Sequence, residues 1–420
     1  MPLPFPRSRS AVLAIAFAAA GVSSSAQEAL DVVRYVEIVR RFHPAAAERA
    51  GLEQAAEAEK RAARVLPDPV FDFSWDRAHP TELPGAKGDE TGYTLSQTLP
   101  WPGTRRARVA AGDRTADVLR AGAEGVAWEI EARARLAFAR LEAARGLLEV
   151  ARGAEEDARS LRDLVARRAD LGESRESDRI KVTVEWLRQQ RQLAAVSREA
   201  QAAEGILRAL AVDPLPEPLL LKPGAYPLLP PLDPAALAAR FAGTNPRLRA
   251  ARAEAARREA LASVARRARI PDLDVSVFRQ RELDKEANGF SVGIKLPLWN
   301  ANRGEIARAE AEQHIAAAAA AREGIDVLTE LEARLTDLVV AADQTALLER
   351  EILPQAARSL ELARLLYEEG ETSLLDLLDA QRTFREAQRE RLESQLAQAL
   401  AVAAVQRLAG PDFDPWRQDT

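Results

Sequence analysis

The sequence predicts a mainly α-helical protein with a small β part, assembled from two copies of one unit. Two segments rich in alanine, glutamate, arginine and leucine run for roughly 65 residues each, which as helices would be on the order of 100 Å long. A glycine-centred turn ends each of them, at Gly172 and at Gly370. Other, short segments alternate apolar and polar residues, which is the pattern of β-strands.

Composition narrows the possible functions. The net charge of −5 argues against a nucleic-acid-binding protein that works through a basic surface. The chain has no cysteine, one methionine and three histidines, so disulfides and thiolate metal sites are excluded. The histidines lie on different segments and no nucleophile–base arrangement is visible. We therefore expect no enzymatic activity, no cofactor and no metal site.

Residues 1–26 are predicted to be a signal peptide. Arg7 and Arg9 precede an apolar stretch from Ala11 to Val22, and small residues up to Ala26 provide a cleavage site. The apolar stretch is shorter than the roughly 20 residues that a membrane-spanning helix needs. No later stretch is long enough either, so any membrane-spanning part of the mature chain would have to consist of strands.

The first repeat is expected to cover residues 27–212 and to open with a helix over 28–65. A strand hairpin over 70–99 follows, and it stops at Pro100 because proline cannot continue a hydrogen-bond ladder. The alternation in its first strand is strict, so the large apolar side chains share one face: Phe71, Phe73 and Trp75.

The second repeat is expected to cover residues 235–410 and to follow the same plan. Its opening helix begins after Asn245-Pro246, and its strand hairpin, over 273–296, again stops at a leucine–proline pair. A tryptophan and nearby arginines follow each hairpin, which fits an anchor at a membrane interface. These residues are Trp101, Arg105 and Arg106 in the first repeat, and Trp299 and Arg303 in the second.

Each repeat ends in a long helical hairpin. The outgoing helices are predicted over 105–170 and 303–369, with tips near 172 and 370, where glycine can adopt the left-handed backbone that ends a helix. Thr372 or Ser373 can cap the helix that returns from the second tip. A proline-rich linker, 213–234, joins the repeats, and residues 411–420 form a C-terminal tail.

Two environments fit the alternating strands. One is a soluble sheet with one face buried, and the other is a membrane with the apolar face against lipid. Four strands cannot close a barrel, because the smallest membrane barrels have about 8. An open sheet in lipid would leave unpaired backbone groups at its edges. If the strands lie in a membrane, several chains must therefore contribute to one barrel.

The order of these features resembles the TolC-like outer-membrane efflux protein family over nearly the whole mature chain. The matching features are the signal peptide, the two repeats, the leucine–proline endings and the two tips. Gly370 and the segment from Leu374 to Gln381 resemble the family's second hairpin turn and the helix after it. The segment from Leu99 to Arg106 is similar to the heavy-metal efflux branch.

The resemblance implies a homotrimer in the outer membrane of a Gram-negative bacterium. Each protomer would give four strands to a shared 12-stranded barrel and its helices to a coiled-coil tunnel in the periplasm. One set of side chains would face lipid: Phe71, Phe73, Trp75, Tyr93, Phe290 and Ile294. The opposite set would face the water-filled lumen: Asp72, Asp76, Thr94, Ser96 and Lys295.

The resemblance also implies a gate at the periplasmic end. The family narrows its tunnel there with aspartate rings, which by position fall on Asp376 and Asp379, one helical turn apart. Three copies would attract cations, and their mutual repulsion would raise their pKa values. The alternative is that both aspartates only complement the helix dipole. The family's tip arginine has no counterpart at Thr372, although Arg175 stands in the other repeat.

The tips would dock a periplasmic adaptor protein, although the same residues also fit ordinary turns: Leu171, Gly172, Glu173, Gly370 and Glu371. The expected function is a passive exit duct of a tripartite efflux system, powered by an inner-membrane pump of the proton-driven type, that exports metal cations or small toxic compounds. The alternative is a periplasmic coiled-coil adaptor, but adaptors have one hairpin and more strands.

Overall fold

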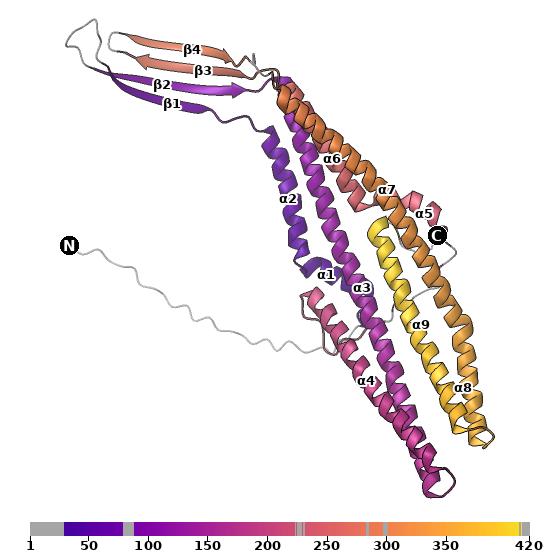
Figure 1. Cartoon of the computed structure of the whole chain (residues 1–420). Coiled ribbons are helices and arrows are strands. Elements are labelled where there is room, and N and C mark those ends of the chain that lie inside the picture. Colours follow the sequence, from indigo (N-terminus) through magenta and orange to yellow (C-terminus); the bar gives the residue numbers. More distant parts are fainter. Residues whose placement is uncertain are drawn as a thin grey trace, which may run out of the picture.

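The computed structural model describes residues 29–78, 88–222, 224, 229, 232–282, 285–296, 301–410 and 413. The expected signal peptide, Trp299 and all of the expected tail except Phe413 lie outside these residues. The molecule is elongated, with a sheet at one end and the tips of two helical hairpins at the other (Figure 1).

The sheet has four antiparallel strands among the described residues, in the order β1-β2-β3-β4. Their bounds are β1 (Val70–Ala78), β2 (Gly88–Leu99), β3 (Leu273–Arg281) and β4 (Glu286–Ile294). The two hairpins join through β2 and β3, where Leu95 is opposite Val277. Strands β1 and β4 are therefore the edges of the described sheet.

The first repeat opens with two helices rather than the single predicted one. These are α1 (Val32–Phe42) and α2 (Ala45–Arg64), and the chain is extended at His43 between them. Pro44 explains the break, because a proline disfavours helical conformation in the residue before it. The long helix α3 (Pro102–Asp170) and the returning helix α4 (Glu176–Ala211) follow.

The outgoing helix of the second repeat is interrupted, where the sequence predicts one continuous helix over 303–369. A wide π turn over Leu348–Ile352 separates α7 (Arg303–Leu347) from α8 (Leu353–Glu368). Pro354 accounts for it, because a proline lacks the N–H that a regular helical turn requires. The repeat also contains α5 (Pro234–Phe241), α6 (Pro246–Arg267) and α9 (Leu374–Ala409).

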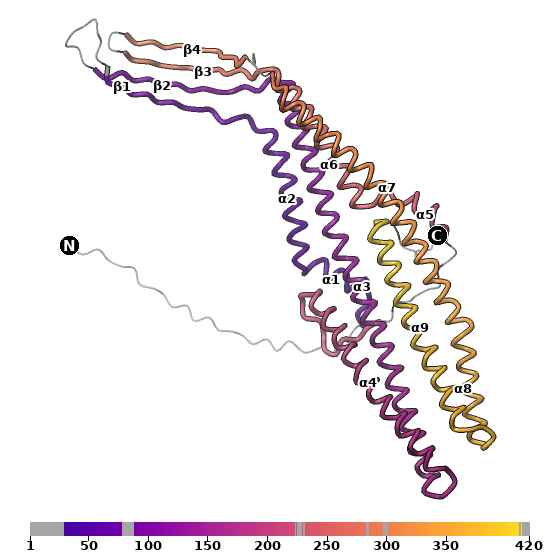
Figure 2. Tube along the Cα trace, viewed as in Figure 1, coloured from indigo at the N-terminus to yellow at the C-terminus, as the bar shows by residue number. Residues whose placement is uncertain are grey.

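The helices form an elongated array that extends from one end of the sheet. Helix α3 contacts helices of both repeats. Helices α2, α3, α6 and α7 lie side by side near the sheet, while α3 with α4 and α8 with α9 form the two hairpins (Figure 2). The buried face of α3 is rich in alanine, as close packing requires. At Gly112 a side chain would collide with Ala63 of α2, so only glycine fits this contact.

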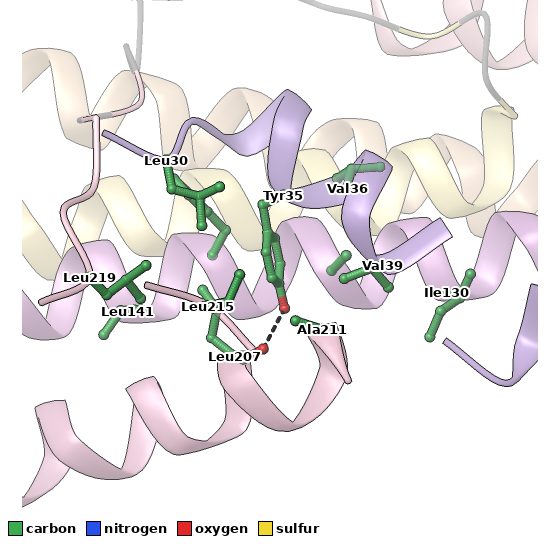
Figure 3. Close-up of a cluster of buried hydrophobic side chains, with 12 residues drawn as sticks. Leu30, Tyr35, Val36, Val39, Ile130, Leu141, Leu207, Ala211, Leu215 and Leu219 are labelled. Carbon is green, nitrogen blue, oxygen red and sulfur yellow. Dashed lines mark hydrogen bonds between the residues drawn. The ribbon is translucent and has the colours of Figure 1, made fainter. Parts of the chain in front are cut away.

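A cluster of buried apolar side chains fixes α1 against α3 and α4 midway along the molecule (Figure 3). The hydroxyl of Tyr35 donates a hydrogen bond to the carbonyl of Leu207, 2.9 Å away. Leu215 and Leu219, from the proline-rich segment, are buried in the same cluster. These two leucines thus anchor the segment to the core, while most of its other described residues are exposed. Phe413 packs edge-to-face on Phe241 in a second cluster.

Candidate functional site

One face of the sheet carries large apolar side chains on all four strands, and near the hairpin turns it also carries Arg77, Arg279 and Arg281. In antiparallel strands, paired residues share a face, and the register pairs Phe73 with Tyr93, and Val277 with Phe290. Ring centroids of Phe73 and Tyr93 lie 5.3 Å apart. All six side chains expected to face lipid lie on this face, with Leu95, Val277 and Val292, and each of these is exposed in the single chain.

The opposite face is mainly polar. It carries Asp72, Asp76, Thr94 and Ser96, four of the five residues expected in the lumen. Lys295 directly follows β4 and, by alternation, continues this face. Asp274, which was not among the residues expected in the lumen, also lies on this face and accepts a 2.5 Å hydrogen bond from Thr98 across the strands. The apolar residues on this face include Val70 and Phe278, and the ring of Phe278 lies over Gly289, where a side chain would collide with it.

Both hairpin tips have the same backbone geometry. Gly172 and Gly370 adopt φ angles of 78° and 79°, the left-handed conformation that favours glycine. Glu173 N–H donates to the Arg168 carbonyl, and Glu371 N–H donates to the Leu366 carbonyl, which is the six-to-one bond of a Schellman motif. The repeats therefore end in matching turns, as the shared glycines predicted.

All five expected adaptor contacts at the tips are exposed. Leu171 is 74% exposed, and Leu375, which sequence analysis missed, is 65% exposed. The neighbours of Leu375 on α9, at positions 374, 377 and 378, are buried. Helical spacing could have shown that Leu375 lies off the buried face. Each hairpin end thus has one exposed leucine among polar residues, Leu171 in the first and Leu375 in the second.

Asp376 forms a capping box at the start of α9. The hydroxyl of Ser373 donates to Asp376 Oδ2 over 2.6 Å, and the hydroxyl of Thr372 donates over 2.9 Å. Asp376 N–H donates in return to Ser373 Oγ. The side-chain hydrogen bonds from Ser373 and Thr372 lower the pKa of Asp376. Within one chain this direction is opposite to the raised pKa expected from repulsion between three copies.

Asp379 differs from Asp376, although both are exposed. Its carboxylate makes no hydrogen bond or ion pair with any described residue, and its backbone carbonyl accepts a bond from Thr383. Of the two aspartates, Asp379 is therefore the one whose charge is available to an ion.

The two hairpins are tied together near their tips. A shared apolar cluster contains residues of α3, α4, α8 and α9, including Val165 and Leu377. Arg364 of α8 forms a 3.0 Å ion pair with Asp157 of α3, and Arg168 lies over the ring of Tyr367. Position 372 is a threonine where the family has its tip arginine, but Arg364 supplies a basic group on the same hairpin.

A second tie centres on Glu185 of α4, whose side chain is only 7% exposed. Arg385 and Arg382 of α9 lie 3.0 and 3.5 Å from it, and Gln189 donates a 2.8 Å hydrogen bond. Burial acts to raise the pKa of Glu185, but the Gln189 bond and the two arginine charges outweigh it and lower the pKa. No local pattern in the sequence indicates this cluster.

Two further features concern the described residues only. No helix in them combines the length and apolar character needed to cross a membrane. No group of three or more potential metal-ligating side chains is gathered in them in an arrangement that could hold an ion.

Known proteins resemble this chain in sequence. A family model described as outer membrane efflux protein matches residues 238–411. The cobalt-zinc-cadmium resistance protein CzcC of Cupriavidus metallidurans is 29% identical over 353 residues, which cover 83% of this chain and 82% of that protein. The chain is thus similar in sequence to outer-membrane efflux proteins over most of its length.

Solved channels of TolC-like fold match the structure along most of its length. The outer-membrane channel OprN has a TM-score of 0.75 at 19% identity, covering 90% of this chain and 89% of that one. CusC has a TM-score of 0.76 at 17% identity, with 90% and 92% covered. VceC of Vibrio cholerae has a TM-score of 0.73 at 20% identity, with 90% and 96% covered. The predicted fold class is thereby confirmed.

The similarity to the outer membrane efflux protein family also bears on the location. The protein belongs to the outer membrane and has a long periplasmic extension. The family works with an adaptor and an inner-membrane pump. It is a family of channel and transport proteins.

Proposed function

We propose that this protein is the homotrimeric exit duct of a tripartite efflux system for divalent metal cations, and that it acts as a passive channel rather than an enzyme. The single observation that carries the proposal is the two-faced sheet, apolar on one side and polar on the other. Such a sheet separates lipid from an aqueous lumen when copies of it close into a ring.

The open edges support assembly from several chains. Strands β1 and β4 each pair with one strand among the described residues, and an unpaired edge in lipid costs several kcal/mol per backbone group. The helices also leave apolar side chains uncovered. Ile180, Val184 and Leu187 form an exposed stripe on α4, and Leu362 and Leu365 are exposed on α8. Neighbouring protomers would bury both sets.

The repeats have separate roles within this proposal. Residues 27–212 and 235–410 form the two repeats, each with one strand hairpin and one helical hairpin, and 213–234 connect them. The apolar side chains of the sheet face lipid, and the polar side chains on its opposite face line the lumen. The tips, through Leu171, Gly172, Glu173, Gly370 and Glu371, dock the adaptor, and Leu375 joins them. A proton-driven inner-membrane pump supplies the substrate.

The cation selectivity is assigned to the aspartates at the periplasmic end. A ring of Asp379 carboxylates concentrates negative potential at a constriction and favours cations over anions. Asp376 contributes less to the field at the pore because its carboxylate is turned back onto Ser373 and Thr372. The substrate class is supported by the relative named for cobalt, zinc and cadmium resistance.

The test compares two alanine variants in planar bilayers. Asp379→Ala is expected to lower the cation-to-anion permeability ratio and to weaken block by divalent cations, and Asp376→Ala is expected to do so to a smaller extent. The measurements are the reversal potential in a salt gradient and the single-channel current. Unchanged permeability in both variants would remove the gate assignment. A soluble monomer in the periplasm would instead favour the adaptor.

A further inference from the structure

A groove lies at the base of the sheet, where the chain leaves β2 and enters α3. Its volume is about 550 Å³, and it is lined by Pro100, Pro102, Arg105, Arg106, Val109, Ala110 and Asp113. Two prolines, a valine and an alanine make most of the lining apolar, while two arginines give it positive charge. This combination fits a ligand that has both an anionic group and an apolar part.

The arginines of the groove are largely free. Arg106 makes no ion pair or side-chain hydrogen bond with any described residue, and the Arg105 guanidinium reaches only the Arg64 carbonyl, at 3.4 Å. The one acid of the lining, Asp113, is paired with Arg64 at 3.1 Å. The positive charge of the groove is therefore not compensated within the described chain.

The groove is separate from a second cavity at the base of the sheet, which adjoins the polar face. Arg108 pairs with Asp272 in a separate cavity that also contains Asp274 of the polar face and Lys295. At 3.6 residues per turn, a residue two positions away lies about 200° around the helix. Arg106 therefore points away from the cavity that contains Arg108, whereas Arg105, three positions from Arg108, lies about 60° from it around the helix. Trp101 beside the groove is 50% exposed, and Val65 and Leu66 at the end of α2 are also exposed.

We propose that this groove binds the headgroup of an anionic phospholipid at the periplasmic surface of the outer membrane, an inference that rests on the proposed function. Arg105 and Arg106 bind the phosphate oxygens, for which the planar guanidinium provides paired donors. Trp101 and the prolines contact the glycerol and upper acyl region, where tryptophan commonly anchors membrane proteins. The bound lipid neutralises the groove and fixes the height of the sheet in the membrane.

The test uses the purified full-length protein in a neutral detergent. Its thermal midpoint is followed by circular dichroism during titration with short-chain phosphatidylglycerol, with phosphatidylcholine and with inorganic phosphate. Only phosphatidylglycerol is expected to raise the midpoint. The double variant Arg105→Gln/Arg106→Gln is expected to need at least about tenfold more lipid, because it loses the charge-assisted hydrogen bonds to the phosphate.

The matched control is Arg159→Gln, an exposed arginine farther along α3 that also lacks an ion pair among the described residues. It is expected to respond to lipid as the wild type does. Equal effects of both lipids, an equal effect of free phosphate, or an unchanged response in the double variant would each overturn the proposal. Failure of the lipid proposal can be told apart from failure of the proposed function. A protein that forms channels but does not respond to phosphatidylglycerol retains the proposed function, whereas a protein that forms no channels does not.

Discussion

Glu185 of α4 and Arg385 of α9 form an ion pair of 3.0 Å, and their side chains are 7% and 16% exposed. The two residues are 200 positions apart in the sequence, so the pair joins the two helical hairpins. A buried charge is costly unless it is paired. The charge of Arg385 therefore lowers the free-energy cost of burying Glu185, and the charge of Glu185 does the same for Arg385.

Removing this carboxylate is expected to destabilise the hairpin end. Glu185→Gln keeps the shape but leaves the Arg385 charge without its partner, and breaking a buried pair in this way costs about 3 kcal/mol. The thermal midpoint of the purified protein measures the loss. Glu393→Gln is the control, since Glu393 forms an exposed pair with Arg389 that is worth at most about 1 kcal/mol. Equal losses in the two variants would contradict the role given to burial.

Acid is expected to loosen the same end. The pKa values of Glu185 and Asp376 are both lowered in the folded chain. Such groups stabilise the fold fully above their unfolded pKa values, about 4, and this stabilisation is lost as the pH falls through the folded values. Hydrogen exchange of α9 should thus show less protection near pH 3 than near pH 6, after correction for intrinsic rates. Glu185→Gln should flatten the difference, and protection that is independent of pH would contradict the assignment.

Reversing the Arg364–Asp157 pair tests whether this contact holds the hairpins together. Arg364→Asp alone places two acids opposite each other and is expected to raise the single-channel conductance by loosening the tips. The double variant Arg364→Asp/Asp157→Arg restores an attractive pair and is expected to return the conductance toward that of the wild type. The pair is half exposed, so its contribution to stability is small, about 1 kcal/mol or less. If the double variant has the same raised conductance as the single variant, the Arg364–Asp157 pair does not hold the hairpins together.

Neighbouring residues on opposite faces of β1 test the two-faced sheet. Phe73→Arg places a charge on the apolar face, at a cost of about 2–4 kcal/mol at the middle of a bilayer. Asp72→Arg changes the adjacent residue on the polar face. The first variant is expected to reduce the amount of assembled protein in outer-membrane fractions on unheated gels, and the second to leave it unchanged. Equal assembly would mean that lipid does not contact the apolar face.

Local sequence patterns predicted the sheet and the tips well. Alternation along Phe71, Phe73 and Trp75 is a property of neighbouring residues, and the backbone converts it directly into a face. Gly172 and Gly370 carry their own conformational preference, so the two turns follow from composition and position. The capping role of Asp376 was also readable, because it stands three residues after Ser373.

Long-range contacts could not be read in the same way. Glu185 stands in a helix rich in charged residues and has the same local context as solvent-exposed glutamates. Its burial depends on the arginines that α9 places against α4, which no pattern within α4 encodes. The π turn before Pro354 and the break at Pro44 were missed for a different reason. A proline shows that the regular helix is disturbed, but the surrounding packing decides between a wide turn and an end.

Among the described residues no strand pairs with the outer edges of β1 and β4, and in the proposed assembly this makes the protein sensitive to its own dosage. In the proposed assembly only another copy can satisfy the N–H and C=O groups of these edges, so a newly exported chain persists only if it meets partners soon. Completed channels should therefore decline more than in proportion when expression falls. A copy whose β4 edge cannot pair should also be a dominant inhibitor, since it occupies two healthy chains without closing the ring.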